Sequence, residues 1–260
     1  MVREIRRRLP HERVIYFGDL ARLPYGIKPE KQIRDFSREN TEFLLHRHVK
    51  ALVVACNSSS SAAFSFLRAR YELPIVDVIG PASQNAVRET RTKKIGVMAT
   101  RATVASEAYE RAIAKIDGRV RVFSKACPLL VPFVEEGILD GQLVQMVLKR
   151  YLSPLLKHKI DTLILGCTHY PLLRGAIRRV VGPKVTLIDS APAAVRELNR
   201  ILLEQEMKRK SERRGALELF VSDLVPNFLT VGAHFLGEPL NNVKVVRLKY
   251  EITRNGRWTL

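Results

Sequence analysis

Two cysteines follow apolar runs in the same way. Cys56 ends the run ALVVAC, and Cys167 ends the run TLILGC. Polar residues come directly after both, Asn57 after the first and Thr168 after the second. A cysteine that only fills a core needs no polar neighbours. The repeated arrangement therefore predicts a paired role for the two thiols.

A thiol at such a position can be a nucleophile, a metal ligand or a proton-transfer group. Zinc needs more ligands than Cys167-Thr168-His169 offers, because no C-x-x-C or H-x-x-x-H companion accompanies it. A nucleophilic cysteine with a histidine base needs only one cysteine. Two matched thiols on opposite walls fit a two-base transfer, in which one thiolate removes a proton from carbon and the other thiol delivers one to the opposite face. Such a transfer inverts a stereocentre.

The elements that must position these thiols are strands alternating with helices. Helical spacing is clear at Phe36, Leu44 and Leu45, and again over 143–152. Apolar runs predict strands at 13–18, 51–56, 74–80, 94–100, 162–167, 184–190 and 217–223. Strands that are apolar throughout and alternate with helices indicate parallel sheets covered on both faces, so the predicted class is α/β.

Functional groups of such sheets lie just past the carboxyl ends of the strands, where Cys56 and Cys167 fall. We expect a helix to start after each cysteine, because a helix N-terminus lowers a thiol pKa and suits a carboxylate ligand. The serines at 58–61 are N-cap candidates.

Two short Pro-containing segments, GPAS at 80–83 and SAPAA at 190–194, are candidate domain crossings. With both as crossings, residues 80–190 form an inserted second domain, and residues 1–79 plus 191–260 form the first. Each domain then carries one of the two cysteines.

The composition fits a protein of the cytoplasm. The 260 residues are 46% hydrophobic, and the chain has neither a run of eighteen apolar residues nor an apolar signal after Met1, so no membrane association is expected. Three cysteines in a chain of this length predict free thiols.

The chain is strongly basic, with 44 Lys and Arg against 26 Asp and Glu, for a net charge of +18. Such a charge favours contact with polyanions. The basic residues are scattered, however, and the local runs at 3–8 and 208–214 include no aromatic residues. We therefore expect solvated basic helix faces and no nucleic-acid site.

Two further segments carry polar groups after apolar runs. ARLPYG at 21–26 predicts a turn whose backbone N–H groups can meet a carboxylate. PLLVPFVEEG at 128–137 brings Glu135 and Glu136, which composition alone favours as an exposed acidic pair.

Five motifs in order carry a family resemblance: GDLARLPYG, CNSSSSA, CPLLVPFVEEG, LGCTHYPLL and LIDS. Together they resemble the bacterial glutamate racemases of the aspartate/glutamate racemase superfamily, and the similarity continues to 220–240. The resemblance implies two similar parallel-sheet α/β domains, related by a pseudo-two-fold axis, with the active site in the cleft between them. It also implies cofactor-independent interconversion of L- and D-glutamate, which supplies D-glutamate for peptidoglycan and so for the cell wall and cell shape.

The resemblance assigns roles to particular residues. Cys56 and Cys167 match the catalytic thiols, each removing the α-proton of one enantiomer, and Glu135 and His169 match assisting residues. Cys127 matches a structural position. Neither a metal nor a cofactor is implied, glutamate is the implied small-molecule partner, and a homodimer is frequent in the family. The residues that match substrate-binding positions are Tyr25, Gly26, Asn57, Ser58, Thr103, Thr168 and His169.

The sequence departs from the family most at its front. It starts within the helix MVREIRRRLP, whereas family members first have an apolar strand and an Asp-Ser loop whose aspartate positions the first thiol. We favour a start codon assigned too late over a degraded copy, because the other motifs are intact. The strands at 13–18 and 51–56 should then have unpaired ladder groups. Smaller departures are Ser58 for threonine, Leu20 for threonine and Ala191 for glycine.

Other functions remain compatible with the sequence. One is racemisation of another amino acid, such as aspartate. A different class is a catalytically impaired scaffold that binds a partner or a polyanion. The amino acid that loses optical activity distinguishes the first, and the salt dependence of DNA affinity distinguishes the second.

Overall fold

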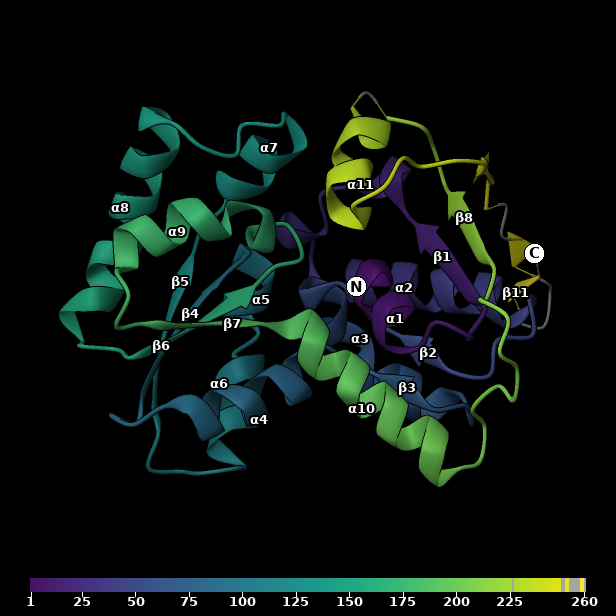
Figure 1. The fold of residues 1–260 in the computed structure, drawn as a ribbon, viewed down its shortest axis with the longest axis horizontal. Helices are drawn as coiled ribbons and strands as arrows, with labels where there is room; N and C mark the ends of the chain where they lie inside the picture. Colours follow the sequence, from purple (N-terminus) through teal and green to yellow (C-terminus); the bar gives the residue numbers. More distant parts are fainter. Residues whose placement is uncertain (226, 249–250, 253–257, 260) are drawn as a thin grey trace.

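The computed structural model has two halves, and each contains parallel strands with helices packed around them (Figure 1). It describes residues 1–225, 227–248, 251–252 and 258–259. Pro226 lies outside the described residues, although it belongs to the segment 220–240 that resembles the family. Part of the predicted first domain beyond residue 248 lies outside them too. The α/β class with parallel sheets is confirmed.

One half of the molecule contains a four-stranded parallel sheet. Its order is β5 (Arg121–Ala126), β4 (Lys94–Ala99), β6 (Thr162–Gly166) and β7 (Thr186–Asp189). Every residue of β6 is buried, as expected of a central strand with helices on both faces. β6 ends at Gly166, so Cys167 lies directly after the carboxyl end of this central strand.

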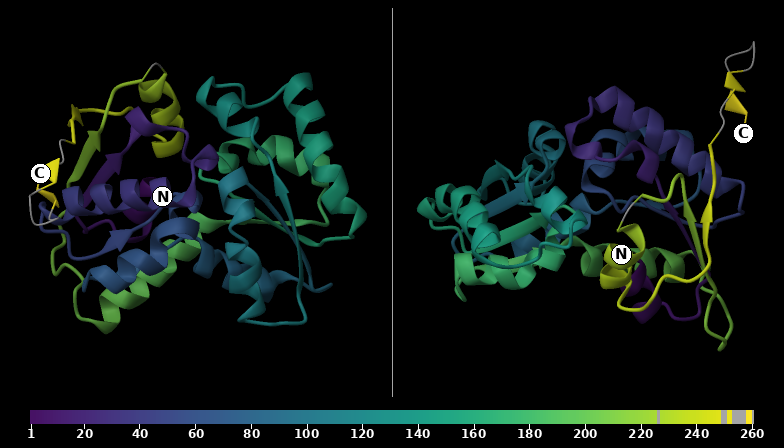
Figure 2. Two further views of the ribbon diagram at one scale, coloured as in Figure 1. Left: turned by 180° about the vertical axis from the view of Figure 1, so that it is seen from behind. Right: turned by 90° about the horizontal axis from the view of Figure 1, so that it is seen from above.

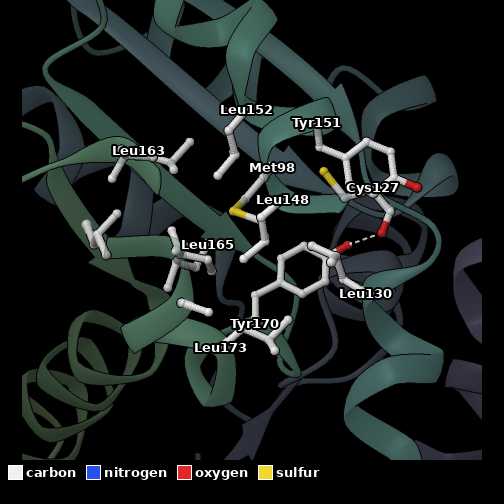
Figure 3. Packing of buried hydrophobic residues seen from close by; sticks show 14 of the residues in the cluster. Met98, Cys127, Leu130, Leu148, Tyr151, Leu152, Leu163, Leu165, Tyr170 and Leu173 are labelled. Carbon is white, nitrogen blue, oxygen red and sulfur yellow. Dashed lines mark hydrogen bonds between the residues drawn. The ribbon is translucent and has the colours of Figure 1, made fainter. Parts of the chain in front are cut away.

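Alternate residues of β6 enter two different cores. Leu163 and Leu165 pack on one face with Met98, and Ile164 packs on the other with residues of β4. Figure 3 shows the first core, in which Tyr170 donates a 2.9 Å hydrogen bond to the carbonyl oxygen of Cys127. The surrounding helices are α4 (Ile79–Glu89), α5 (Arg101–Ala105), α6 (Ala108–Ala114), α7 (Leu130–Glu135), α8 (Gln142–Lys157) and α9 (Arg174–Val181), with the 3-10 turn η3 (Tyr170–Leu173).

The other half contains two separate parallel groups of strands. β1 (Val14–Gly18) pairs with β8 (Leu217–Val221), which pairs with β9 (Val243–Val245). β2 (Leu52–Val53) pairs with β3 (Ile75–Val76). The other elements are α1 (Val2–Arg8), η1 (Leu20–Arg22), η2 (Tyr25–Ile27), α2 (Glu30–Leu45), α3 (Asn57–Arg70), α10 (Ser190–Glu204), α11 (Phe228–Leu236), β10 (Glu251–Ile252) and β11 (Trp258–Thr259).

Within the described residues, β1 and β2 each have a single strand partner and do not pair with each other. The unpaired ladder groups expected at 13–18 and 51–56 are therefore present. In contrast, β4 and β6 are each paired on both sides.

Each predicted strand contains an observed one, but β5 was missed because its sequence RVFSKA contains three polar residues and no apolar run longer than two. GPAS and SAPAA both lie inside helices, α4 and α10, so Pro and Gly there do not mark loops. The two helices pack against each other, and the two views in Figure 2 show the halves of the molecule side by side. The division at residues 80 and 190 stays a prediction.

Among the described residues, no helix has both the length and the apolar character needed to cross a membrane.

Candidate active site

A cavity of about 1380 Å³ lies between the two halves of the molecule. Residues after β1 and β2 line one wall, and residues after β6 and in α7 line the other. The cavity therefore lies at the carboxyl ends of strands from both halves, where parallel sheets place their functional groups. The predicted site residues that line it are Tyr25, Gly26, Cys56, Asn57, Ser58, Glu135, Cys167, Thr168 and His169.

Cys56 is the residue directly before α3. Burial raises the pKa of the Cys56 thiol, and the N–H and hydroxyl of Ser59 in the first turn of α3 oppose the shift. A negative charge on Cys167 also raises the pKa of Cys56, so the two sulfurs interact electrostatically across the cavity. The serines were predicted as N-caps, and this is wrong: they lie inside the helix, and Cys56 occupies the N-cap position.

Cys167 follows β6 and is 6% exposed. Its sulfur lies 3.7 Å from Nδ1 of His169, and the hydroxyl of Thr168 lies 3.4 Å from the same nitrogen. No α-helix starts directly after Cys167, in contrast to the prediction. The 3-10 turn η3 begins at Tyr170 instead. The polar partner of this thiol is therefore an imidazole, and that of Cys56 is a helix N-terminus.

His169 is held between the thiol and a carboxylate. Its Nε2 lies 3.4 Å from Oε1 of Glu135, an ion-pair distance without hydrogen-bond geometry. Burial lowers the pKa of His169, but interactions with Cys167 and Glu135 outweigh it and raise this pKa from its usual 6.5 to about 10. The ring of Phe235 in α11 packs edge-on against the imidazole, with centroids 5.7 Å apart. At neutral pH the imidazole is therefore positively charged, and it lies beside the sulfur of Cys167.

Glu135 was favoured on composition as half of an exposed acidic pair, and its side chain is 38% exposed, with one carboxylate oxygen buried. Its Oε1 is buried and faces His169, because α7 ends at this residue beside η3. Glu136, the next residue, is exposed.

Three hydroxyl groups connect the two halves of the molecule. Ser58 Oγ in α3 lies 2.9 Å from Thr100 Oγ1 and 3.3 Å from Thr103 Oγ1, and the two threonine oxygens lie 3.1 Å apart. We call Ser58, Thr100 and Thr103 the hydroxyl triangle. Thr103 does not itself line the cavity, and it reaches the site through the other two.

Asn57 is oriented by a tyrosine from the other half of the molecule. Tyr109 in α6 is buried, and its O–H donates to Asn57 Oδ1 at 2.7 Å. The amide nitrogen of Asn57 is buried and has no hydrogen-bond partner among the described residues. Since a buried amide donor without a partner is costly, this N–H₂ group is available for an acceptor on a ligand.

Tyr25 is fixed behind the cavity wall by a polar network. Its hydroxyl donates to Asp19 Oδ2 and accepts from Asn40 Nδ2 at 3.1 Å. The other carboxylate oxygen of Asp19 accepts from Ser222 Oγ at 3.0 Å. The network ties the turn after β1 to β8, and so fixes the position of Gly26.

Gly26 has no room for a side chain. A Cβ atom there would lie 2.6 Å from Cβ of Thr100. We expect Gly26→Ala to push the two halves apart at the hydroxyl triangle, lowering stability by about 1–3 kcal/mol and kcat/KM by about tenfold or more.

Urea denaturation and steady-state kinetics measure both effects. The matched control is Gly175→Ala in α9, where the nearest atom to a new Cβ is 3.9 Å away, so stability should hold or rise. Unchanged stability and activity in Gly26→Ala would show that this close approach is unimportant.

Among the described residues, no group of three or more His, Cys, Asp or Glu side chains is placed to hold a metal ion. The third cysteine, Cys127, lies in the core of the four-stranded sheet (Figure 3). Burial raises the pKa of Cys127 to about 12. The groups that lie around the two thiols include an imidazole, the carboxylate of Glu135 and several neutral donors. Such a set is suited to moving protons beside an anion.

Sequence reasoning missed Thr100, Tyr109, Asp19 and Phe235. Thr100 directly follows the strand KIGVMA, so a search for hydroxyl groups after each strand would have found it. Tyr109 gives no such signal, because it reaches Asn57 across 52 positions of chain.

Comparisons with known proteins agree with this geometry. The family model described as Asp/Glu/hydantoin racemase matches residues 1–198. The chain therefore belongs to the Asp/Glu/hydantoin racemase family.

Within that family the chain is similar to proteins named glutamate racemase. One from Geobacter metallireducens is 42% identical over 96% of this chain and 93% of that protein. The structure of a glutamate racemase isoform from Bacillus anthracis aligns with a TM-score of 0.91 and 37% identity, over 95% of this chain and 93% of that one. A Francisella tularensis glutamate racemase, solved in complex with D-glutamate, aligns with a TM-score of 0.89 and 34% identity, over 95% and 92% of the two chains.

Proposed function

We propose that the chain interconverts L- and D-glutamate without a cofactor, by proton transfer between Cys56, Cys167 and the α-carbon. The observation that supports this most directly is the location of the two thiols, which line one cavity from opposite halves of the molecule. The names of the relatives, glutamate racemase, support glutamate as the substrate. The product D-glutamate is proposed to supply peptidoglycan synthesis.

In the proposed reaction one sulfur is a thiolate and the other a thiol. The thiolate takes the α-proton, so an S–H bond forms, the C–H bond breaks and its electron pair stays on the α-carbon and carboxylate. The opposite thiol then gives its proton to the other face of the carbon and becomes the thiolate. Charge is conserved, and the enzyme ends with its two protonation states exchanged.

The surroundings of the two thiols differ, and so we propose different protonation states for them before the reaction. His169, whose pKa is raised to about 10, places a positive charge 3.7 Å from the sulfur of Cys167. Burial favours the protonated form of Cys56. The resting site at neutral pH is therefore proposed to have Cys167 as the base and Cys56 as the acid, ready for one of the two enantiomers.

The carboxylate that gains charge in the transition state needs donors that are already oriented. The free N–H₂ of Asn57, the hydroxyl triangle and Thr168 are proposed to supply them. Fixed donors in a site that excludes water stabilise such charge without reorganisation. Each tenfold gain in rate requires about 1.4 kcal/mol of this stabilisation.

The substrate is tested by following α-proton exchange into deuterated water by NMR, with glutamate and aspartate offered separately. Exchange is a suitable readout, because each inversion by two thiols replaces the α-proton with one that derives from the solvent. We expect glutamate to exchange at least tenfold faster than aspartate. Faster exchange with aspartate would contradict the substrate assignment while leaving the thiol chemistry intact.

Tyr109 is proposed as the residue that orients Asn57. Tyr109→Phe removes only the O–H, so Asn57 Oδ1 loses its donor and the amide is free to turn over. Leaving one buried acceptor unsatisfied costs about 1–3 kcal/mol, so kcat/KM should fall about tenfold, mainly through a higher KM.

The matched control is Tyr151→Phe in α8, whose hydroxyl only accepts from the N–H of Leu129, at 3.5 Å. KM should stay within about twofold in this variant, because so long a hydrogen bond is weak. An equal rise of KM in both variants, tracking lost stability, would mean that Tyr109 has only a structural role.

The homodimer implied by the resemblance and the domain division at residues 80 and 190 remain predictions.

A further inference from the structure

Tyr170 carries a hydroxyl group into an apolar core. Its side chain is fully buried beside the four-stranded sheet, in the core that contains Met98, Leu148 and Leu165 (Figure 3). The O–H donates to the carbonyl oxygen of Cys127 at 2.9 Å. Burying a hydroxyl group is unfavourable unless it is hydrogen-bonded, and a phenylalanine would fill the same space. The contact with Cys127 is therefore what the hydroxyl contributes.

The hydroxyl of Tyr170 cannot exchange protons with a substrate in the cavity. Burial raises the pKa of Tyr170, and negative charge on Cys167 or Cys127 raises it further, so the phenol stays a hydrogen-bond donor at neutral pH. The side chain also lies outside the cavity wall. Any effect of Tyr170 on the site must pass through the residues that it holds.

Cys127 lies where a strand end meets the start of a helix. It directly follows β5, and its N–H donates at 2.8 Å to the carbonyl of Ala99, the last residue of β4. The Cys127 carbonyl accepts from the N–H of Leu130 at 3.3 Å as well as from Tyr170. Since Leu130 is the first residue of α7, this carbonyl fixes where α7 starts.

The backbone of Tyr170 belongs to the turn after β6. Its N–H donates to the carbonyl of Cys167 at 3.2 Å, which closes a turn that contains Thr168 and His169. Tyr170 thus connects this turn, through its own side chain, to the segment that leads into α7.

The same two segments carry the charged pair of the site. His169 lies in the turn after β6, and Glu135 is the last residue of α7. Nε2 of His169 lies 3.4 Å from Oε1 of Glu135. For the residues that the structure describes, this ion pair and the hydrogen bond of Tyr170 are the polar contacts between the segments 127–135 and 167–173.

We propose that Tyr170 is a positioning residue, whose hydroxyl holds the start of α7 against the turn after β6 and so sets the distance between His169 and Glu135. The charge on His169 depends on this distance, because the attraction between an imidazolium and a carboxylate weakens as they separate. The effect on His169 is a property of the fold, whereas its consequence for racemisation rests on the proposed function.

Tyr170→Phe tests this role, since it keeps the ring in the core and removes the hydrogen bond. NMR titration measures the pKa of His169, whose resonance is identified by its absence in His169→Asn. Burial lowers this pKa and Cys167 and Glu135 raise it, while α11 presents the uncharged ring of Phe235. We expect the pKa to fall from about 10 to about 9 or lower, and kcat/KM to fall about tenfold.

The matched control is Tyr71→Phe, which also removes a hydroxyl donor. The hydroxyl of Tyr71 donates to Oε1 of Glu42 at 3.1 Å, and neither residue lines the cavity. Urea denaturation should show a loss of stability in both variants, whereas the pKa of His169 should stay unchanged in Tyr71→Phe.

A second comparison places Tyr170→Phe in a chain that also carries Glu135→Gln. The carboxylate charge is then absent, so its distance from His169 no longer matters. Removal of the Tyr170 hydroxyl should therefore change the pKa of His169 by less than half as much as it does when Glu135 is present.

An unchanged pKa of His169 in Tyr170→Phe, or an equal change in Tyr71→Phe, would overturn the proposal. An equal fall with and without Glu135 would overturn it too, since the hydroxyl would then act by another route. Racemisation is measured in parallel. Its absence in the unmodified chain, with the expected fall of the pKa in Tyr170→Phe, would count against the proposed function and not against the positioning role.

Discussion

Cys56→Ser and Cys167→Ser are each expected to lower the rate of racemisation by about 10³-fold or more. A serine hydroxyl is far less acidic than a thiol, so it can neither hold the charge of the base nor release a proton readily. Both sulfurs are needed in each turnover, one as base and the other as acid. Circular dichroism with each enantiomer as starting material measures the loss.

The two variants should differ in exchange although they agree in racemisation. L- and D-glutamate have equal free energies in water, so kcat/KM must fall by the same factor in both directions. The remaining thiolate can still exchange the α-proton of the one enantiomer whose C–H bond points toward it. Cys56→Ser should therefore retain exchange of one enantiomer, and Cys167→Ser of the other.

Cys127→Ser is the matched control. This cysteine lies in the core of the four-stranded sheet, and its S–H contacts the carbonyl of Lys125 at 3.4 Å, which a serine hydroxyl can also do. Racemisation should change by less than about threefold, with a small loss of stability. Full racemase activity in Cys56→Ser or Cys167→Ser would refute the two-base assignment.

His169→Asn is expected to lower kcat/KM by about 10²-fold. The folded-state pKa of His169, about 10, lies above its usual 6.5. The imidazolium is therefore charged up to about pH 9, and its support for the Cys167 thiolate is lost as the pH rises through 10. The wild-type rate should fall on this alkaline limb, and the variant should lack the limb.

Glu135→Gln separates the imidazolium from its carboxylate. Glu135 raises the pKa of His169, so removing its charge should move the alkaline limb to lower pH without abolishing it. His158→Asn is the control, because His158 stacks on Phe123, 3.9 Å between centroids, away from the cavity. An unchanged limb in His169→Asn would show that another group is responsible for it.

The sequence predicted the parts of the site that are local in the chain. Cys167 follows TLILG, a short, mostly apolar run typical of a buried parallel strand, so its position at the carboxyl end of such a strand was predictable. The pairing of Cys167 with His169 spans two residues and was equally accessible.

What could not be predicted depends on contacts between distant segments. Tyr109 in α6 donates to Asn57 in α3 across 52 positions of chain, a contact that depends on how the two halves of the molecule meet. The serines after Cys56 have the composition of N-caps, yet the helix begins at Asn57 because Cys56 itself takes the extended conformation. β5 was missed because three of its six residues are polar and no apolar run is longer than two.

The most direct test of the two-thiol mechanism is the isotope at the α-carbon of the first product formed in deuterated water. L-glutamate with protium at this carbon is the starting material, and NMR and chiral separation are applied before one tenth of it has reacted. Because the proton delivered to the product comes from a different thiol than the one that received the substrate proton, we expect D-glutamate with deuterium and residual L-glutamate with protium. D-glutamate that retains the original protium would mean that a single base returns the proton to the other face, and would contradict the two-thiol mechanism.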